Sequence, residues 1–365
     1  MLLRALIHAM EHYNVIGIMS GTSLDGVDLA FCHFTKEDSG WKFEIRNTTT
    51  VEYSDEWVEK LSTLHKKDGL ALAKTHAEYG HFLGMLAKEF IHRNQLRADF
   101  VSSHGHTIFH QPQNKFTFQL GDGAALSAAC ELPVVCDFRS TDVGLGGQGA
   151  PLVPIGDEIL FGVYDFCLNL GGIANISFKL SNERIAFDVA PCNMVLNYLS
   201  LKLGKKYDDE GRFAEKGNVN ESLFKQLNDL DYYKKKFPKS LGREDVEINF
   251  IPVVEFQTVS TEDMLRTFCE HIAIQISNVI ASYPQLPTPN SLLFITGGGA
   301  LNKFLIGRIE KLSALKIIIP DKKIIEYKEA LIFAFLGVLR WRGEVNCLKS
   351  VTGAIRDNCG GAIYF

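Results

Sequence analysis

The feature that most constrains this sequence is a set of three glycine turns, each of which follows a short apolar segment. The turns have the sequences SGTSLDG at 20–26, LGGI at 170–173 and TGGGA at 296–300. Glycine lets the backbone turn tightly and brings its N–H groups close to an anion, because no Cβ intervenes. Three such turns in one chain predict phosphate binding. The sequence has no GxxxxGK[ST] segment, which excludes a P-loop.

The segments around the first two turns repeat one order of elements. The apolar patterns predict strands at 15–19, 27–34 and 41–53, and again at 164–170, 173–180 and 184–187. Helical spacing then follows the first hairpin over 56–95, and helices are predicted after the second at 193–203, 219–229 and 261–283. These patterns indicate a duplicated α/β architecture.

Shorter signals complete the predicted order. We expect further strands at 98–103, 116–120, 133–136 and 291–296, with helices at 122–131, 301–312 and 326–342. The charged, glycine-containing stretches 204–218 and 231–250 are predicted to be loops or lobes. A chain of 365 residues favours two domains. We predict an extension at 1–14, a first domain at 15–150 joined by the segment 343–365, and a second domain at 151–342.

Composition excludes several classes of protein. The net charge of −5 argues against a nucleic-acid binder, which carries a basic face. No run of 18 apolar residues occurs, so we expect no membrane segment. The eight cysteines form no CxxC pair, which argues against zinc and thioredoxin-type sites and favours a reducing cytoplasm.

Longer blocks of sequence carry a more specific signal. In chain order they are GIMSGTSLDGVD (17–28), SHGHTIFHQP (103–112), QLGDG (119–123), DFRSTDVGLGGQGAPLVP (137–154), LNLGGIANIS (168–177), PKSLGRED (238–245), ITGGGALN (295–302) and VTGAI (351–355). These blocks resemble the anhydro-N-acetylmuramic acid kinase family, within the superfamily of actin, hexokinase and the heat-shock ATPases. The resemblance implies a two-domain actin-like ATPase fold of the ribonuclease H-like kind.

The resemblance also implies an activity. Such an enzyme uses ATP, Mg²⁺ and water to open 1,6-anhydro-N-acetylmuramic acid, and its product is N-acetylmuramic acid 6-phosphate in peptidoglycan recycling. It suggests a homodimer that binds a small amino-sugar as its substrate. Two alternatives stay open: a kinase of the same fold acting on another sugar, and a nucleotide switch like actin or the heat-shock chaperones.

The resemblance places the nucleotide at the three glycine turns. The residues it implies are Gly21, Thr22, Ser23, Leu24, Asp25, Gly26, Val27, Asp28, Gly171, Gly172, Gly297, Gly298 and Gly299. Many kinases of the superfamily have a magnesium-binding Asp just before the first turn, where this chain has Met19 and Ser20. Asp25 is the expected substitute, acting through water molecules.

The segment FDVAPCN at 187–193 resembles the family's FD-x-GPGN segment, which carries the catalytic base. Asp188 is therefore implied as the base that deprotonates the attacking water. The alternative is that Asp188 caps the helix that follows. Ala190 and Cys192 replace the two expected glycines, at a cost of about 1 kcal/mol or more wherever a positive φ is needed.

For the sugar, the resemblance points to Arg139 and Glu329, with Asp142, Gln148 and Asn193 as weaker candidates. Arg139 can hold the lactyl carboxylate with a forked pair of donors. Glu329 can accept hydrogen bonds from sugar hydroxyls, or it can be a solvated carboxylate at a helix start.

Two clusters suggest other chemistry. His104, His106 and His110 follow a strand, but no carboxylate stands at metal-ligand spacing, so a substrate or interdomain contact from His104 is favoured over a metal. The basic run YYKKK at 232–236 lacks an aromatic stacking platform and is interpreted as a solvated loop face.

Overall fold

The computed structural model describes residues 11–21, 24–255, 258–283 and 290–365. The chain divides into two compact units, Met1–Phe161 with Tyr327–Phe365 (unit 1) and Gly162–Glu326 (unit 2). The predicted boundaries differ, since they placed 151–161 and 327–342 in the second domain. These segments pack in unit 1, where Lys328 forms a buried ion pair of 2.7 Å with Asp157.

The sheet of unit 1 has the strand order β13-β7-β4-β1-β2-β3. Its strands are β1 (His12–Ser20), β2 (Gly26–Glu37), β3 (Gly40–Glu52), β4 (Phe100–Ser103), β7 (Val134–Cys136) and β13 (Ala362–Tyr364). The first three form an antiparallel meander, and β4 and β7 continue the sheet parallel to β1. Because β1 begins at His12, the end of the predicted extension 1–14 belongs to the sheet; residues 1–10 lie outside the described residues.

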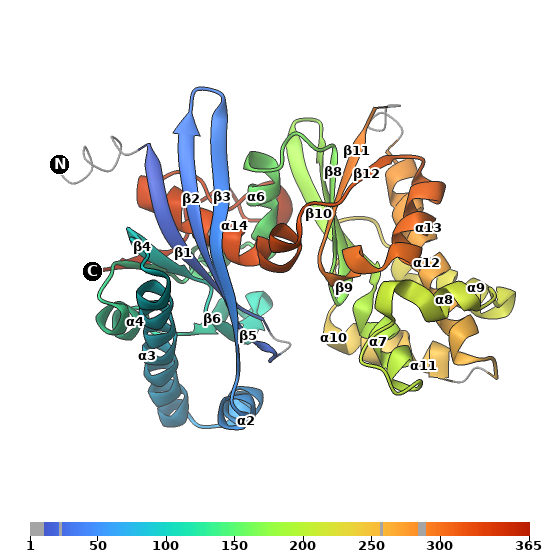
Figure 1. Cartoon of the computed structure of the whole chain (residues 1–365), viewed down its shortest axis with the longest axis horizontal. Helices are drawn as coiled ribbons and strands as arrows, with labels where there is room; N and C mark the ends of the chain where they lie inside the picture. Colours follow the sequence, from blue (N-terminus) through green and yellow to red (C-terminus); the bar gives the residue numbers. More distant parts are fainter. Residues whose placement is uncertain (1–10, 22–23, 256–257, 284–289) are drawn as a thin grey trace. The chain divides into compact units, whose positions relative to one another are not determined.

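Helices cover both faces of this sheet (Figure 1). Alternation along β1 directs Ile16 and Ile18 into one core cluster with Tyr79 and Leu83 of α3. On the opposite face, a Cβ at Gly17 would lie 2.0 Å from a backbone oxygen of α14, so only glycine permits this close approach. The helices of unit 1 are α2 (Asp55–Thr63), η1 (Leu64–Lys66), α3 (Gly69–Asn94), α4 (Gly123–Cys130), α5 (Ser140–Gly144), α6 (Val153–Ile159), α15 (Lys349–Thr352) and most of α14 (Lys322–Arg342).

The segment 106–111 forms a strand that the sequence patterns did not predict. It is strand β5 (His106–Gln111), which pairs antiparallel with β6 (Phe116–Leu120) in a separate two-stranded sheet. The connection is the short helix η2 (Pro112–Asn114), which ends with Lys115 in the left-handed region. The pairing of β5 with β6 depends on this turn. Apolar and polar residues alternate only weakly along β5, so little in the sequence indicated this strand.

The sheet of unit 2 repeats the order of unit 1 as β10-β9-β8-β11-β12. Its strands are β8 (Phe166–Leu170), β9 (Ile173–Leu180), β10 (Glu183–Pro191), β11 (Leu292–Thr296) and β12 (Lys316–Ile318). Again three strands form an antiparallel meander, and two more follow parallel to the first. The predicted duplicated α/β fold is confirmed.

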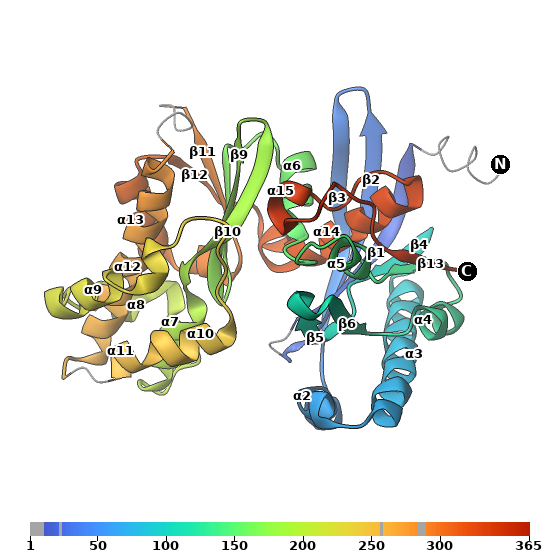
Figure 2. The same cartoon turned by 180° about the vertical axis from the view of Figure 1, so that it is seen from behind.

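The helices of unit 2 and this sheet share one core cluster. Figure 2 shows these helices and strands from behind. They are α7 (Asn193–Leu201), η3 (Asp209–Gly211), α8 (Arg212–Lys216), α9 (Glu221–Asn228), η4 (Asp231–Lys234), α10 (Arg243–Asn249), α11 (Ile251–Glu255), α12 (Thr261–Ala281), η5 (Gly298–Leu301) and α13 (Lys303–Ser313). The stretches 204–218 and 231–250, predicted as loops, therefore contain short helices. No helix among the described residues is long and apolar enough to cross a membrane.

Candidate active site

The first glycine turn connects β1 to β2 in unit 1. Ser20 ends β1 and is buried, while Asp25 is exposed. The Val27 side chain lies in the core, so its contribution to a ligand is limited to its backbone. Asp28 accepts a hydrogen bond of 2.6 Å from the Thr50 hydroxyl. Thr22 and Ser23, predicted to bind phosphate, lie outside the described residues.

Arg139 precedes α5, and burial lowers the pKa of its guanidinium to about 10. Its Nε donates to His104 Nε2 at 3.0 Å, and its Nη1 donates to the Gly149 carbonyl at 2.9 Å. Both acceptors are uncharged, and no carboxylate forms an ion pair with Arg139 in the described part of the chain. Desolvating a cation is costly, and the negative charge of Glu329 offsets part of that cost. Three of its five N–H donors remain for an anion.

Asp142 has a structural position rather than the predicted substrate contact. It is completely buried, and its Oδ2 accepts the Gly149 N–H at 2.8 Å. Its Oδ1 accepts hydrogen bonds from Thr352 and Asn358, at 2.9 and 2.8 Å. Asp142 thus fixes Gly149, the residue whose carbonyl accepts the hydrogen bond from Arg139.

Gln148, another predicted substrate residue, is exposed in the loop that contains Gly149. Its backbone N–H donates to the Thr352 carbonyl at 2.8 Å, which ties the loop to the C-terminal segment. Its exposed side chain leaves a ligand contact open.

Glu329 lies in α14 two residues after the non-helical Tyr327, which divides α14 into two helices, so it stands in the first turn of the second one. Its side chain is exposed, yet protein atoms crowd the carboxylate, and this desolvation raises its pKa. The positive charges of Arg139 and Lys328 lower it, and Asp28 raises it further. Glu329 and Arg139 therefore belong to one electrostatic cluster of unit 1.

The second and third glycine turns meet in unit 2. They follow β8 and β11, which are parallel neighbours, so both turns lie at the same edge of the sheet. A Cβ at Gly297 would lie 2.8 Å from the backbone oxygen of Leu170, and Gly297 has a φ of +79°. The Asn193 amide donates to the same oxygen at 2.9 Å and thereby joins the two turns to α7. This edge is where open α/β sheets bind ligands.

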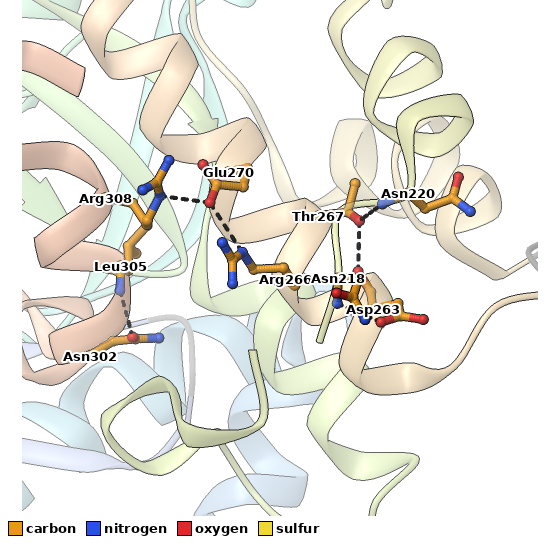
Figure 3. A network of polar contacts seen from close by, with 9 residues as sticks. All are labelled: Asn218, Asn220, Asp263, Arg266, Thr267, Glu270, Asn302, Leu305 and Arg308. Carbon is orange, nitrogen blue, oxygen red and sulfur yellow. Dashed lines mark hydrogen bonds and ion pairs between the residues drawn. The ribbon is translucent and has the colours of Figure 1, made fainter. Parts of the chain in front are cut away.

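A polar network joins α12 to the helix that follows the third turn (Figure 3). Asn302 follows η5 and caps α13 by accepting the Leu305 N–H at 2.9 Å. Glu270 of α12 pairs with Arg308 of α13 at 2.6 Å and with Arg266 at 3.1 Å. The third turn thus opens a 3₁₀ helix and then a capped helix, which fixes the direction of its backbone N–H groups.

Asp188 lies near the end of β10, at a register shift of the β9–β10 pair. Its Oδ2 accepts the Leu241 N–H at 2.8 Å, and its carbonyl accepts the Tyr232 hydroxyl at 2.6 Å. Burial raises the pKa of Asp188 to about 6, opposed by the Leu241 hydrogen bond and by Lys239. Asp188 does not cap α7, whose N-cap position is Cys192. A carboxylate titrating near neutral pH suits a general base.

Sequence analysis missed the groups that hold Asp188. The Lys239 ammonium lies 4.5 Å from the centre of the Tyr232 ring and within 5.9 Å of two further aromatic rings. Burial lowers the pKa of Lys239, and Asp188 raises it. The tyrosine belongs to the run 232–236, which was interpreted as a solvated loop face; the lysines at 234–236 are exposed, but Tyr232 is buried. Lys239 and Tyr232 together form a clamp on Asp188. In the sequence, its one signal was the block 238–245.

The two positions where glycine was expected do not need a positive φ. Neither Ala190 nor Cys192 has a positive φ, and both side chains are buried in the core of unit 2. Cys192 has φ −130° and ψ −106°. The anticipated penalty therefore does not arise, and Asp188 and Asn193 keep their places on either side of the segment.

Comparison with known proteins identifies the family. The profile described as anhydro-N-acetylmuramic acid kinase matches residues 13–365. The chain belongs to this kinase family. A Vibrio vulnificus (strain CMCP6) protein named anhydro-N-acetylmuramic acid kinase is 35% identical over 96% of this chain and 97% of its own length. A protein of the same name from Sulfurovum sp. (strain NBC37-1) is 34% identical over 97% and 100% of the two chains.

Among solved structures, component A of the Acidaminococcus fermentans (R)-2-hydroxyglutaryl-CoA dehydratase matches with a TM-score of 0.47 and 12% identity, over 90% of this chain and 99% of that one. The family resemblance predicted from the sequence blocks is confirmed by the profile and the curated relatives.

In this member of the anhydro-N-acetylmuramic acid kinase family, the three histidines have separate surroundings. His104 bonds Arg139, His106 is buried beside Tyr79, and His110 Nδ1 lies 3.2 Å from the Thr117 hydroxyl. No group of three or more His, Cys, Asp or Glu side chains that could hold a metal ion occurs among the described residues.

Proposed function

We propose that this kinase uses ATP and one water molecule to open 1,6-anhydro-N-acetylmuramic acid and to phosphorylate its O6. The product is N-acetylmuramic acid 6-phosphate, a step in the recycling of cell-wall peptidoglycan. Membership of the family over residues 13–365 supports this choice of substrate. The observation that carries the chemistry is Asp188, a desolvated carboxylate with one oxygen held and the other without a protein partner in the described part of the chain.

Asp188 acts as the general base in this reaction. Its Oδ1 takes a proton from a water molecule, whose oxygen attacks the anomeric carbon. The bond between that carbon and O6 then breaks, and O6 takes the γ-phosphoryl group of ATP as ADP leaves. The proton on Asp188 is released to solvent. The Leu241 N–H keeps the carboxylate oriented, and the charge of Lys239 keeps it ionised.

Unit 1 supplies the groups that recognise the sugar. The free donors of Arg139 bind the lactyl carboxylate, because a guanidinium with unused N–H groups can hold a carboxylate with a forked pair of hydrogen bonds. Glu329 accepts hydrogen bonds from sugar hydroxyls, and the positive charge of Arg139 favours its ionised form. Gln148 and Asn193 stay weaker candidates for substrate contacts.

The nucleotide is held by the glycine turns. Backbone N–H groups of the first and second turns bind phosphate oxygens, and the third turn lies against the adenosine. Mg²⁺ neutralises phosphate charge when it is bound. The exposed carboxylate of Asp25 fits a water-mediated contact. Mg²⁺ in nucleotide sites keeps several of its water molecules and uses one or two carboxylates.

The assembly and location stay predictions from the sequence. We predict that the protein is a homodimer and that it is located in the cytoplasm. Light scattering on the purified protein tests the assembly, and fractionation of cells tests the location.

A substrate panel tests the proposed activity. The protein is incubated with MgATP and, separately, with 1,6-anhydro-N-acetylmuramic acid, N-acetylmuramic acid, glucosamine and glucose. ADP release and the sugar phosphate are measured together. We expect one sugar phosphate per ADP with the anhydro-sugar. Phosphorylation of a plain hexose and not the anhydro-sugar would favour another sugar kinase. ATP hydrolysis that ignores every sugar would favour a nucleotide switch.

A further inference from the structure

The loop after β4 contains a buried histidine, His104, whose two ring nitrogens are both bonded. Its Nδ1 lies 2.8 Å from the Gly105 carbonyl oxygen, and its Nε2 lies 3.0 Å from Arg139 Nε. A carbonyl only accepts, so Nδ1 carries the hydrogen. A guanidinium only donates, so Nε2 carries none. The contacts alone fix His104 as a neutral ring in one tautomer, and burial, which lowers its pKa, agrees with this.

The Gly105 carbonyl has a second donor. Ser20 Oγ donates to it at 2.9 Å, and Ser20 is the last residue of β1, directly before the first glycine turn. Ser20 and His104 are 2% and 5% exposed, so water does not compete for these bonds. A continuous hydrogen-bonded path therefore runs from the start of the phosphate turn through Gly105 and His104 to Arg139, all within unit 1.

The His104 ring is also fixed by packing. Its centre lies 4.6 Å from the centre of the Phe333 ring in α14. The Phe333 carbonyl in turn accepts the Ser102 hydroxyl at 2.5 Å, which ties α14 to β4. The ring therefore cannot turn without disturbing a buried helix–sheet contact.

We propose that His104 is a positioning residue, which orients Arg139 for the substrate carboxylate and couples that orientation to the first phosphate turn. Arginine has a flexible side chain, and a forked contact with a carboxylate requires one orientation of the guanidinium. His104 fixes Nε, and the Gly149 carbonyl fixes Nη1. This inference rests on the proposed role of Arg139 in binding the lactyl carboxylate.

Kinetics of His104→Phe provide the first test, with His104→Gln as a milder variant and His106→Phe as a control for another buried histidine of the same loop. We expect His104→Phe to raise the KM for the anhydro-sugar by about tenfold or more, the size of a lost hydrogen bond to a charged group. The KM for ATP stays within about twofold of wild type. His104→Gln, which keeps an acceptor, recovers part of the loss, and His106→Phe does not raise the sugar KM.

A sugar without the lactyl carboxylate separates positioning from a general structural defect. With 1,6-anhydro-N-acetylglucosamine, His104→Phe and wild type should show the same KM, because Arg139 has no carboxylate to bind. An equal penalty on both sugars would overturn the proposal. Ser20→Ala should give a smaller rise in the KM for the anhydro-muramic sugar, about two- to fivefold, and its effect should not add to that of His104→Phe.

Nitrogen-15 NMR of the substrate-free protein decides the geometry without any activity. We expect the His104 ring to be neutral, with its hydrogen on Nδ1. We also expect the Arg139 Nε–H to exchange slowly with water in wild type and rapidly in His104→Gln. A hydrogen on Nε2, or rapid exchange in wild type, would overturn the positioning role. Failure of the substrate panel would overturn the proposed function instead, since the NMR measurement needs no substrate.

Discussion

Arg139 of unit 1 and Asp188 of unit 2 are both charged groups withdrawn from water, but the protein treats them in opposite ways. Arg139 receives two uncharged acceptors and, among the residues that the structure describes, no ion pair. Asp188 receives one backbone N–H and the charge of Lys239, and burial still raises its pKa to about 6. A guanidinium that keeps unused N–H donors is suited to bind an anion. A carboxylate balanced near neutral pH is suited to exchange a proton.

The largest expected effect comes from removing the base. Asp188→Asn keeps the shape of the side chain and an acceptor for Leu241, but it cannot take a proton. We expect kcat to fall by roughly 10²–10⁴-fold, the usual contribution of a general base, with the affinity for ATP nearly unchanged. Steady-state kinetics and nucleotide titration measure both. Near-normal turnover would show that another group is the base.

Removing the unpaired cation should act on binding more than on turnover. Arg139→Met should raise the KM for the anhydro-sugar by about 10- to 100-fold, with a smaller change in kcat. Arg139→Lys should recover only part of the loss, because an ammonium lacks the forked geometry. An unchanged KM in Arg139→Met would place the substrate carboxylate elsewhere.

A pH profile tests the electrostatic half of the comparison. Because the folded pKa of Asp188 is raised to about 6, kcat/KM in wild type should fall as the pH drops through that region. Lys239→Met removes a charge that lowers this pKa, so the acidic limb should move to higher pH by about half a unit to one unit. The two proteins should converge at alkaline pH.

Lys235→Met serves as the matched control for that profile. Lys235 lies 5.9 Å from the centre of the same Tyr232 ring but is exposed. Its removal should leave the acidic limb in place. A shift equal to that of Lys239→Met would mean that general surface charge, rather than the clamp, sets the pKa of Asp188.

The smallest expected effect concerns the altered segment beside the base. Since Ala190 has no positive φ, restoring glycine brings no relief of strain. Ala190→Gly should lower the free energy of unfolding by about 0.5–1 kcal/mol, through the added freedom of the unfolded chain, and leave kcat almost unchanged. Denaturant unfolding measures the change. A clear gain in stability or turnover would show that the alanine is strained.

The two sites also differ in how far sequence predicts them. The strands and the glycine turns followed from apolar runs that end at glycine, and the similar order of the two main sheets followed from the repeated order of elements. Asp188 and Arg139 came from their sequence blocks. Local patterns suffice there because strand, turn and functional residue are adjacent in the chain.

The residues that support each site could not be predicted, because their contacts join distant segments. Lys239 meets Asp188 from a stretch about fifty positions away, in a region that looked like a solvated loop. Asp142 looked like a substrate residue, yet it is saturated by Thr352 and Asn358 from the C-terminal segment. His104 looked like a substrate contact. Its hydrogen-bond partner, Arg139, follows thirty-five positions later, so no local pattern revealed the pair.

The most direct test of the account follows the oxygen of water into the product. The reaction is run in ¹⁸O-water with MgATP and 1,6-anhydro-N-acetylmuramic acid, and the product is analysed within minutes, before its anomeric hydroxyl exchanges with solvent. We predict one ¹⁸O on the anomeric carbon of N-acetylmuramic acid 6-phosphate and none in the phosphate group. Label in the phosphate, or a phosphorylated sugar whose anomeric carbon is unlabelled, would contradict the attack of a water activated by Asp188.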